Sequence, residues 1–145
     1  MKVHFFSEDL NKRYPKFKPI WRKWIQSIIE NEGFKLINVN YVFCSEDFLH
    51  QINLQYLNHD THTDIITFDL SDDKSEIEGE IYISIPMVTE NAQKFKTDFE
   101  TELARVVAHG VLHLCGYLDK KKEDILVMRA KEQFYMDQLL VMLVK

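Results

Sequence analysis

The segment "VVAHGVLHLCGYLD", Val106–Asp119, constrains this chain most, because it places two histidines inside an apolar run. Its apolar residues recur at the spacing of a buried helix, and Gly116 stands where a left-handed cap would end that helix. Side chains four residues apart lie on one face of a helix, one turn apart. His109 and His113 would therefore project side by side, and Asp119, just beyond the cap, could join them.

Two imidazole nitrogens and one carboxylate oxygen form a donor set for a divalent ion such as Zn²⁺. Three protein ligands leave an open coordination position, which is typical of catalytic rather than structural zinc sites. Histidines at this spacing can also be hydrogen-bonded core residues, but a glycine and an aspartate at these offsets favour a metal. We expect His109, His113 and Asp119 to bind one divalent ion per chain, Zn²⁺ or a harder ion, with Cys115 pointing away as a buried thiol.

The pattern H-x-x-x-H-x-x-G-x-x-D is close to the metzincin peptidase motif H-E-x-x-H-x-x-G-x-x-H. Gly110 stands where the peptidase has its glutamate, and Asp119 stands where it has a third histidine. A peptidase needs that glutamate to activate the metal-bound water and to carry its proton to the leaving amine. A metallopeptidase is therefore the least favoured interpretation.

The remaining sequence predicts one α+β domain over residues 1–145. Strands are predicted by alternating or β-branched stretches at 2–8, 35–45, 64–70 and 79–85. Helices are predicted by the spacing of apolar residues at 19–31, 45–56, 86–95, 97–116 and 122–143. Residues 71–78 predict an acidic turn. In this order the elements favour a small mixed β-sheet covered by helices, with the histidine-bearing helix at the centre.

Composition indicates the class of protein and the cellular compartment to expect. With 145 residues and 46% hydrophobic residues, the chain can bury a substantial core. Two cysteines are too few for a disulfide framework, so we expect reduced thiols. The apolar runs are too short for a membrane span, and the first residues lack the long apolar region of a signal peptide. We therefore expect a cytoplasmic protein with no membrane partner.

Charge is unevenly distributed along the chain. The net charge of −5 argues against nucleic acid as a partner. Residues 11–23, however, contain six basic residues and no acidic one: Lys12, Arg13, Lys16, Lys18, Arg22 and Lys23. Such a cluster can bind phosphates, although on this feature alone the solvated face of a helix is the favoured explanation. We keep these residues as candidate RNA contacts.

Three segments resemble one known family. "HGVLHLCGY" resembles the signature H-G-x-L-H-L-x-G-Y-D-H of the YbeY family of bacterial endoribonucleases. "INLQYLNHDTHTDIITF", Ile52–Phe68, resembles the family's L-N-x-x-Y-R-x-x-D-x-P-T-D-V-L-S-F, and "GEIYISIPMVTENA" resembles its G-D-I-x-I-S strand and the helix that follows. The resemblance covers most of the chain from about Phe43 onward, in the right order.

The resemblance implies a zinc-binding, single-domain endoribonuclease that acts in the maturation of ribosomal RNA and in quality control of the small ribosomal subunit. It places His109 and His113 on the first two metal ligands of the catalytic centre. The third ligand, a histidine in the family, falls on Asp119. Because a carboxylate can replace an imidazole as a metal ligand, the site can survive this change.

A second difference from the family pattern affects a residue with a role in RNA cleavage. The family's arginine, credited with a role in RNA cleavage, falls on Leu57, which cannot pair with a phosphate. His59 or His62, in the same loop, or a basic residue of the N-terminal segment could supply the missing cation. A solvated loop is the alternative for both histidines, and we favour it for His62, whereas His59 is kept as a candidate RNA contact.

These observations leave two main hypotheses. The first is a single-strand-specific, metal-dependent endoribonuclease that processes the 3′ end of small-subunit ribosomal RNA, with the ion acting as Lewis acid at phosphorus. The second is a non-catalytic ribosome-biogenesis factor with a structural metal, which docks on the small ribosomal subunit through the basic segment. We favour the first, and a monomer as its oligomeric state. The residues identify no general base.

Overall fold

The computed structural model describes residues 1–144 and contains four strands and five helices. The strands are β1 (Val3–Glu8), β2 (Lys35–Cys44), β3 (Ile65–Asp69) and β4 (Glu76–Ser84). The helices are α1 (Lys18–Asn31), α2 (Glu46–Leu57), α3 (Ile85–Lys94), α4 (Phe99–Leu114) and α5 (Lys122–Val144). This confirms the predicted α+β class and the predicted order of elements.

The four strands form one mixed sheet in the order β1-β2-β4-β3. Strand β2 pairs in parallel with both β1 and β4, whereas β3 pairs antiparallel with β4 at the edge. Parallel neighbours need crossover connections, and α1 provides the crossover between β1 and β2. One predicted boundary is wrong: β4 begins at Glu76, inside the segment predicted as a turn, because Glu76 and Ile77 pair with Lys35 and Leu36 of β2.

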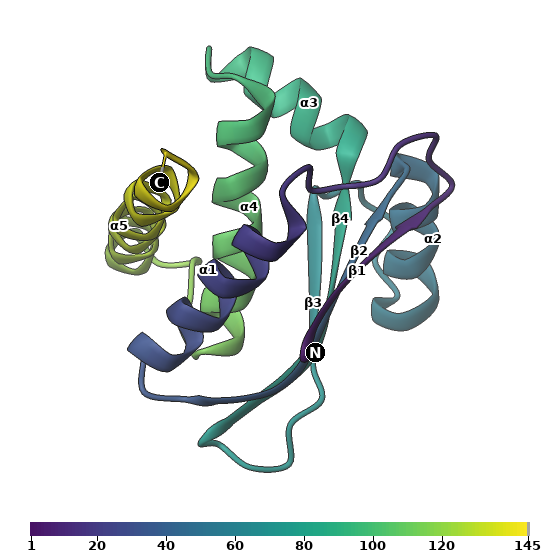
Figure 1. Cartoon of the computed structure of the whole chain (residues 1–145). Helices are drawn as coiled ribbons and strands as arrows, with labels where there is room; N and C mark the ends of the chain where they lie inside the picture. Colours follow the sequence, from purple (N-terminus) through teal and green to yellow (C-terminus); the bar gives the residue numbers. More distant parts are fainter. Residues whose placement is uncertain (145) are drawn as a thin grey trace.

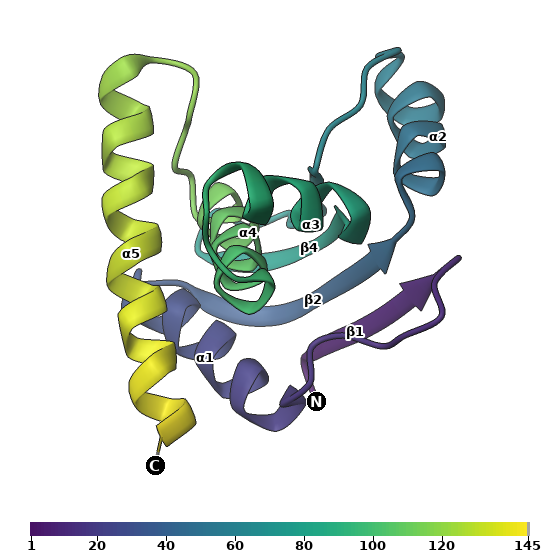
Figure 2. The ribbon, with the colours of Figure 1, turned by 90° about the horizontal axis from the view of Figure 1, so that it is seen from above.

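Helices cover both faces of the sheet unequally. Helices α1, α4 and α5 lie on one side, and α2 lies on the other (Figure 1). Helix α4 occupies the middle of this arrangement, between α5 and α2 when the molecule is seen from above (Figure 2). Leu103, Val107 and Val111 of α4 are completely buried. The helix that carries both histidines is therefore central, as predicted.

Helix α4 approaches the sheet closely at Gly110. A Cβ atom at this position would lie 2.9 Å from Cγ2 of Ile81 and 3.0 Å from Cδ1 of Ile65. Carbon atoms make favourable contacts only at about 3.5–4.0 Å, so any side chain here would force the helix away from the strands. The glutamate of the peptidase motif therefore has no room in this fold, which agrees with the argument against a metallopeptidase.

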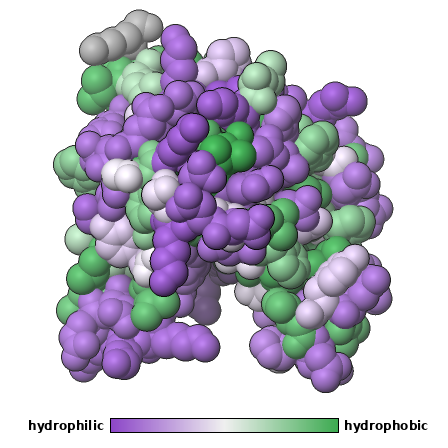
Figure 3. Space-filling view, turned by 90° about the horizontal axis from the view of Figure 1, so that it is seen from below, coloured by the Kyte–Doolittle hydropathy of each residue, from purple (hydrophilic) through white to green (hydrophobic). Residues whose placement is uncertain are grey.

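Within residues 1–144, no helix is both long enough and apolar enough to span a membrane. The face of the molecule seen from below is covered mostly by hydrophilic side chains, and its hydrophobic side chains lie in scattered groups (Figure 3). The largest buried side chains are instead in the core around the sheet, among them Trp24, Tyr41 and Phe43.

Candidate metal centre

The turn at the end of α4 brings Asp119 back to the histidines. Gly116 adopts a left-handed conformation with φ of 102°. The Tyr117 N–H then donates to the Leu112 carbonyl oxygen at 3.1 Å, and the Gly116 N–H donates to the His113 carbonyl oxygen at 3.0 Å. This pair of hydrogen bonds is the Schellman pattern of a glycine-capped helix. The chain turns back after the cap, and Asp119 lies beside the face that carries the histidines.

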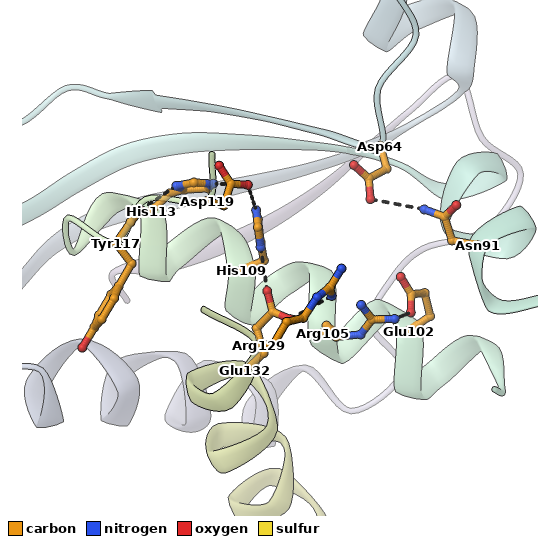
Figure 4. A network of polar contacts seen from close by, with 10 residues as sticks. All are labelled: Asp64, Asn91, Glu102, Arg105, His109, His113, Tyr117, Asp119, Arg129 and Glu132. Carbon is orange, nitrogen blue, oxygen red and sulfur yellow. Dashed lines mark hydrogen bonds and ion pairs between the residues drawn. The ribbon is translucent and has the colours of Figure 1, made fainter. Parts of the chain in front are cut away.

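His109, His113 and Asp119 converge on a single point (Figure 4). Oδ2 of Asp119 lies 3.2 Å from Nε2 of His109 and 3.3 Å from Nε2 of His113. One potential ligand atom from each residue lies within 4.8 Å of the other two, a separation that could hold one metal ion. The structure therefore brings together the three residues singled out in the sequence.

The hydrogen bonds made by Nδ1 of each imidazole determine which ring nitrogen has a lone pair available for a metal ion. Nδ1 of His113 lies 2.8 Å from the Tyr117 carbonyl oxygen, and Nδ1 of His109 lies 2.6 Å from Oε2 of Glu132. A carbonyl and an ionised carboxylate only accept, so each Nδ1 carries the hydrogen. In the neutral rings both Nε2 lone pairs then point toward the Asp119 carboxylate. Such a convergence of electron-rich atoms is favourable only with positive charge between them, and a divalent ion fits this donor set.

Glu132 of α5 contacts a candidate ligand and was not predicted from the sequence. Its side chain is almost completely buried, with Oε2 on His109 and Oε1 3.1 Å from Nη1 of Arg129. These two partners offset the cost of burying a carboxylate. A glutamate among the buried positions of α5, with Met128 and Tyr135, was the available signal.

The cluster opens into a cavity of about 380 Å³. Residues from the start of β3 and from α3, α4 and α5 surround it, and the side chain of Asp119 is 38% exposed. A substrate can therefore reach the three candidate ligands. The polar residues of the lining, besides the ligands, are Thr63, Asp64, Thr67, Asn91, Glu102, Arg105, Arg129 and Glu132.

Glu102 and Arg105 form a second polar group in this cavity. Burial raises the pKa of Glu102, and the nearby Asp64 raises it further, while the paired Arg105 lowers it. Asn91 donates to Oδ2 of Asp64 at 3.3 Å. Four carboxylates and two guanidiniums line the cavity. If the histidines are neutral and the carboxylates ionised, a bound divalent cation would bring the formal charge of the cavity lining to zero.

Cys115 is not part of the cluster. It packs against the main core, and burial raises the pKa of its thiol to about 12. Thiolates rather than thiols bind metals, so a ligand role is not favoured. The side chain packs on the core as expected, although it is half-buried rather than buried.

The loop after α2 reaches the metal cavity only through its last residues, Thr63 and Asp64. Within the described part of the chain, Leu57, His59 and His62 are absent from the residues that line the cavity. His62 lies 2.9 Å from Glu46 and stacks on His50, with ring centroids 4.2 Å apart. Leu57 itself lies outside this lining, and contact of His59 with RNA stays a prediction.

The basic segment lies elsewhere on the surface. Lys12, Arg13 and Lys18 line a separate surface pocket beside β1. Nε of Arg22 donates to the Val3 carbonyl oxygen at 3.1 Å, which ties this side chain to β1. Of residues 1–144, those that line the metal cavity include none of the six basic residues of this segment. Their contact with RNA stays a prediction.

Together, the fold and the cluster define an α+β protein with an open, three-ligand candidate metal site on its central helix. A family model described as "Endoribonuclease YbeY" matches residues 4–140. The chain therefore belongs to the YbeY endoribonuclease family.

Known proteins agree with this assignment. The "Endoribonuclease YbeY" of Amoebophilus asiaticus is 48% identical over 134 residues, covering 92% of this chain and 90% of that protein. The protein of the same name from Flavobacterium psychrophilum is 55% identical over 109 residues, or 75% and 77% of the two chains. A solution structure from Thermotoga maritima is 30% identical, has a TM-score of 0.65, and covers 94% of this chain and 88% of its own.

Proposed function

We propose that this chain is a single-domain, metal-dependent endoribonuclease whose ion is held by His109, His113 and Asp119. Membership of the YbeY family supports an enzyme that cuts RNA internally. The observation that carries the metal site is the convergence of two Nε2 atoms on one Asp119 oxygen while both Nδ1 atoms are held by acceptors.

The chain's own residues prepare this site before any substrate arrives. Glu132 and the Tyr117 carbonyl favour the hydrogen on Nδ1, so in the neutral rings both Nε2 lone pairs are available to a metal ion. The bound ion would supply Lewis-acid chemistry at the phosphodiester. His109 and His113 act in this scheme as ligands rather than as proton-transfer groups, because neither ring nitrogen is free.

We propose Zn²⁺ as the ion. Two nitrogens and one oxygen suit zinc, and three protein ligands match its catalytic sites. The carboxylate of Asp119 reduces the net charge at the ion compared with a third histidine. A bound water would consequently be less acidic than at a three-histidine site.

The family also suggests which RNA is the substrate. We propose single-stranded ribosomal RNA, at the 3′ end of the small-subunit RNA, with the small ribosomal subunit as partner and a role in ribosome quality control. A monomer in the cytoplasm is the proposed state. The similarity of the three sequence segments to the YbeY signatures supports this assignment.

Cleavage of a labelled single strand tests the activity. Zinc-loaded wild type is incubated with the strand and with a duplex of the same sequence, beside His113→Ala and the control His62→Ala, which lies outside the cavity. We expect the single strand to be cut by wild type and control, and at least about 100-fold more slowly by His113→Ala, because a ligand is lost. Equal cleavage by His113→Ala, or none by wild type, would contradict the proposal.

The binding factor remains a second candidate, because Leu57 removes the family arginine and the basic segment lies outside the metal cavity. In that case the metal would be structural and Lys12, Arg13 and their neighbours would contact the ribosome. Complementation separates the two. If His113→Ala and Asp119→Ala keep their RNA affinity but fail to rescue a processing defect, the binding factor is excluded.

A further inference from the structure

A shallow pocket adjoins the metal cavity. Phe95, Arg105, Arg129 and Gln133 line this pocket, which has a volume of about 380 Å³ and which we call the Phe95 pocket. Phe95, Arg105 and Arg129 line the metal cavity as well. The two spaces are therefore adjacent, and a chain of nucleotides in the Phe95 pocket could extend toward the candidate metal ligands.

Phe95 has an unusual environment for a large aromatic side chain. It is 51% exposed at the end of α3, and the guanidinium of Arg105 lies 5.3 Å from the centre of its ring. Lys94 and Lys96, its neighbours in the chain, are both exposed. An exposed ring beside a guanidinium, with exposed lysines on either side in the chain, gives a stacking surface for a base together with positive charge for a phosphate.

Arg129, on α5, contributes unused N–H donors to the same pocket. Its side chain is 53% exposed, and its contact with Glu132 uses one nitrogen of the guanidinium. A guanidinium carries five N–H donors, so Arg129 can hold Glu132 and still contact a phosphate oxygen. Arg105 reaches the same pocket from α4, although part of its capacity is used by Glu102.

We propose that the Phe95 pocket binds one nucleotide of a single-stranded RNA. The base stacks on Phe95, the phosphate contacts Arg105 and Arg129, and the adjoining phosphodiester extends toward the metal cluster. This inference rests on the proposed RNA substrate. It also accounts for Leu57, because the guanidiniums that contact RNA come from α4 and α5 instead of α2.

The proposal favours single strands for a physical reason. A base within a duplex is stacked on its neighbours, and exposing it costs a few kcal/mol. A free strand presents its bases to an aromatic side chain without that cost.

A rival surface offers similar chemistry. Phe6 is 48% exposed and lines the pocket that Lys12, Arg13 and Lys18 share beside β1. Phe6→Leu therefore serves as a matched variant for Phe95→Leu, with the same change at a similar exposure. For the lysines, Lys94→Gln is matched by Lys74→Gln in the loop between β3 and β4, at the opposite end of the sheet from α3 (Figure 1).

The experiment measures fluorescence anisotropy of a labelled 2′-O-methyl RNA strand of about eight nucleotides, a typical site size, with zinc-loaded protein. We expect Phe95→Leu to weaken binding by about 5- to 100-fold, as loss of one stacked base does. We expect Lys94→Gln to weaken it a few-fold and to reduce its salt dependence, and both matched controls to stay within about twofold of wild type. Circular dichroism and zinc content verify that each variant is folded.

Wild-type affinity in Phe95→Leu, loss of affinity in Phe6→Leu instead, or no binding by wild type would each overturn the Phe95 pocket. Gel analysis after the titration confirms that the strand is intact, so binding is measured apart from cleavage. If binding depends on Phe95 but wild type cuts no RNA, the pocket stands and the proposed activity fails.

Discussion

At the scale of single residues, the two histidines are oriented by anchors of different origin. His113 is held by a backbone carbonyl of its own helix end, whereas His109 is held by Glu132 from another helix. The first anchor forms with the cap at Gly116. The second depends on the packing of α5 against α4, so substitutions in either helix can disrupt it.

Glu132→Gln tests the second anchor. The amide keeps the shape of the side chain but removes the charge that favours the Nδ1–H tautomer of His109. Residues that orient metal ligands typically contribute about 10- to 100-fold to metal affinity. We expect a loss of that size, measured by competition with a coloured zinc chelator. Glu123→Gln, exposed in the first turn of α5, should match wild type; wild-type affinity in Glu132→Gln would argue that the anchor is dispensable.

Only some residues of the candidate site could be predicted from the sequence. His109, His113 and Asp119 were predictable because they lie within a single helix and its cap, where spacing alone determines their positions. Glu132, Arg105 and Arg129 were not, because their meeting requires α4 and α5 to pack together. No local pattern in the sequence encodes that contact.

At the scale of elements, Gly110 determines how closely α4 lies on the sheet. Helix propensity alone would favour alanine at this position by about 1 kcal/mol. The contact with Ile81 opposes that gain, since a Cβ would lie 2.9 Å from its Cγ2 atom. The position of the histidine-bearing helix over β4 therefore depends on a residue that has no side chain.

Gly110→Ala should destabilise the protein despite the better helix propensity. Overpacking of this kind costs about 1–3 kcal/mol in the free energy of unfolding. Urea denaturation measures the change. Ala130→Gly, at an exposed position of α5, calibrates the propensity term and should cost about 0.5–1 kcal/mol. A Gly110→Ala variant more stable than wild type would show that α4 is not in close contact with the sheet.

The elements themselves were largely predictable from local patterns. Helices and strands followed the spacing of apolar residues, because each buries one face against the core. The start of β4 was missed, since "SEIE" resembles an acidic turn and becomes a strand only through its pairing with β2. Pairing register depends on a segment some 40 residues away in the chain, beyond the reach of local propensity.

At the scale of the whole molecule, Glu32 joins three distant segments behind the metal site. Its carboxylate accepts from Tyr117 at 2.6 Å and from Lys131 at 3.2 Å, and also from the Tyr135 hydroxyl. Burial raises the pKa of Glu32, but these three hydrogen bonds lower it by more, so it lies below its ordinary value. The end of α1 is thus tied to α5 and to Tyr117, the residue whose carbonyl holds His113.

This network predicts a pH dependence with a definite sign. A carboxyl whose pKa is lowered by folding stabilises the protein fully above its unfolded pKa, and this contribution is lost as the pH falls through the folded pKa. Glu32→Gln should therefore cost about 1–3 kcal/mol of unfolding free energy at neutral pH, as expected for hydrogen bonds to a charged group. Near about pH 3, below the usual pKa of a glutamate, the difference from wild type should shrink.

Urea unfolding of both proteins at the two pH values measures this effect. Glu30→Gln, an exposed neighbour on α1, should show no comparable loss. The same deficit of Glu32→Gln at both pH values would mean that its carboxylate charge contributes little to stability.

The most direct test of the central proposal is elemental analysis of wild type, His113→Ala and Asp119→Ala, each purified without added metal. The site predicts about one zinc per chain in wild type and loss of the metal in both variants, because each variant removes one of three ligands. Zinc retained in both variants, or absent from wild type, would contradict a metal centre formed by His109, His113 and Asp119.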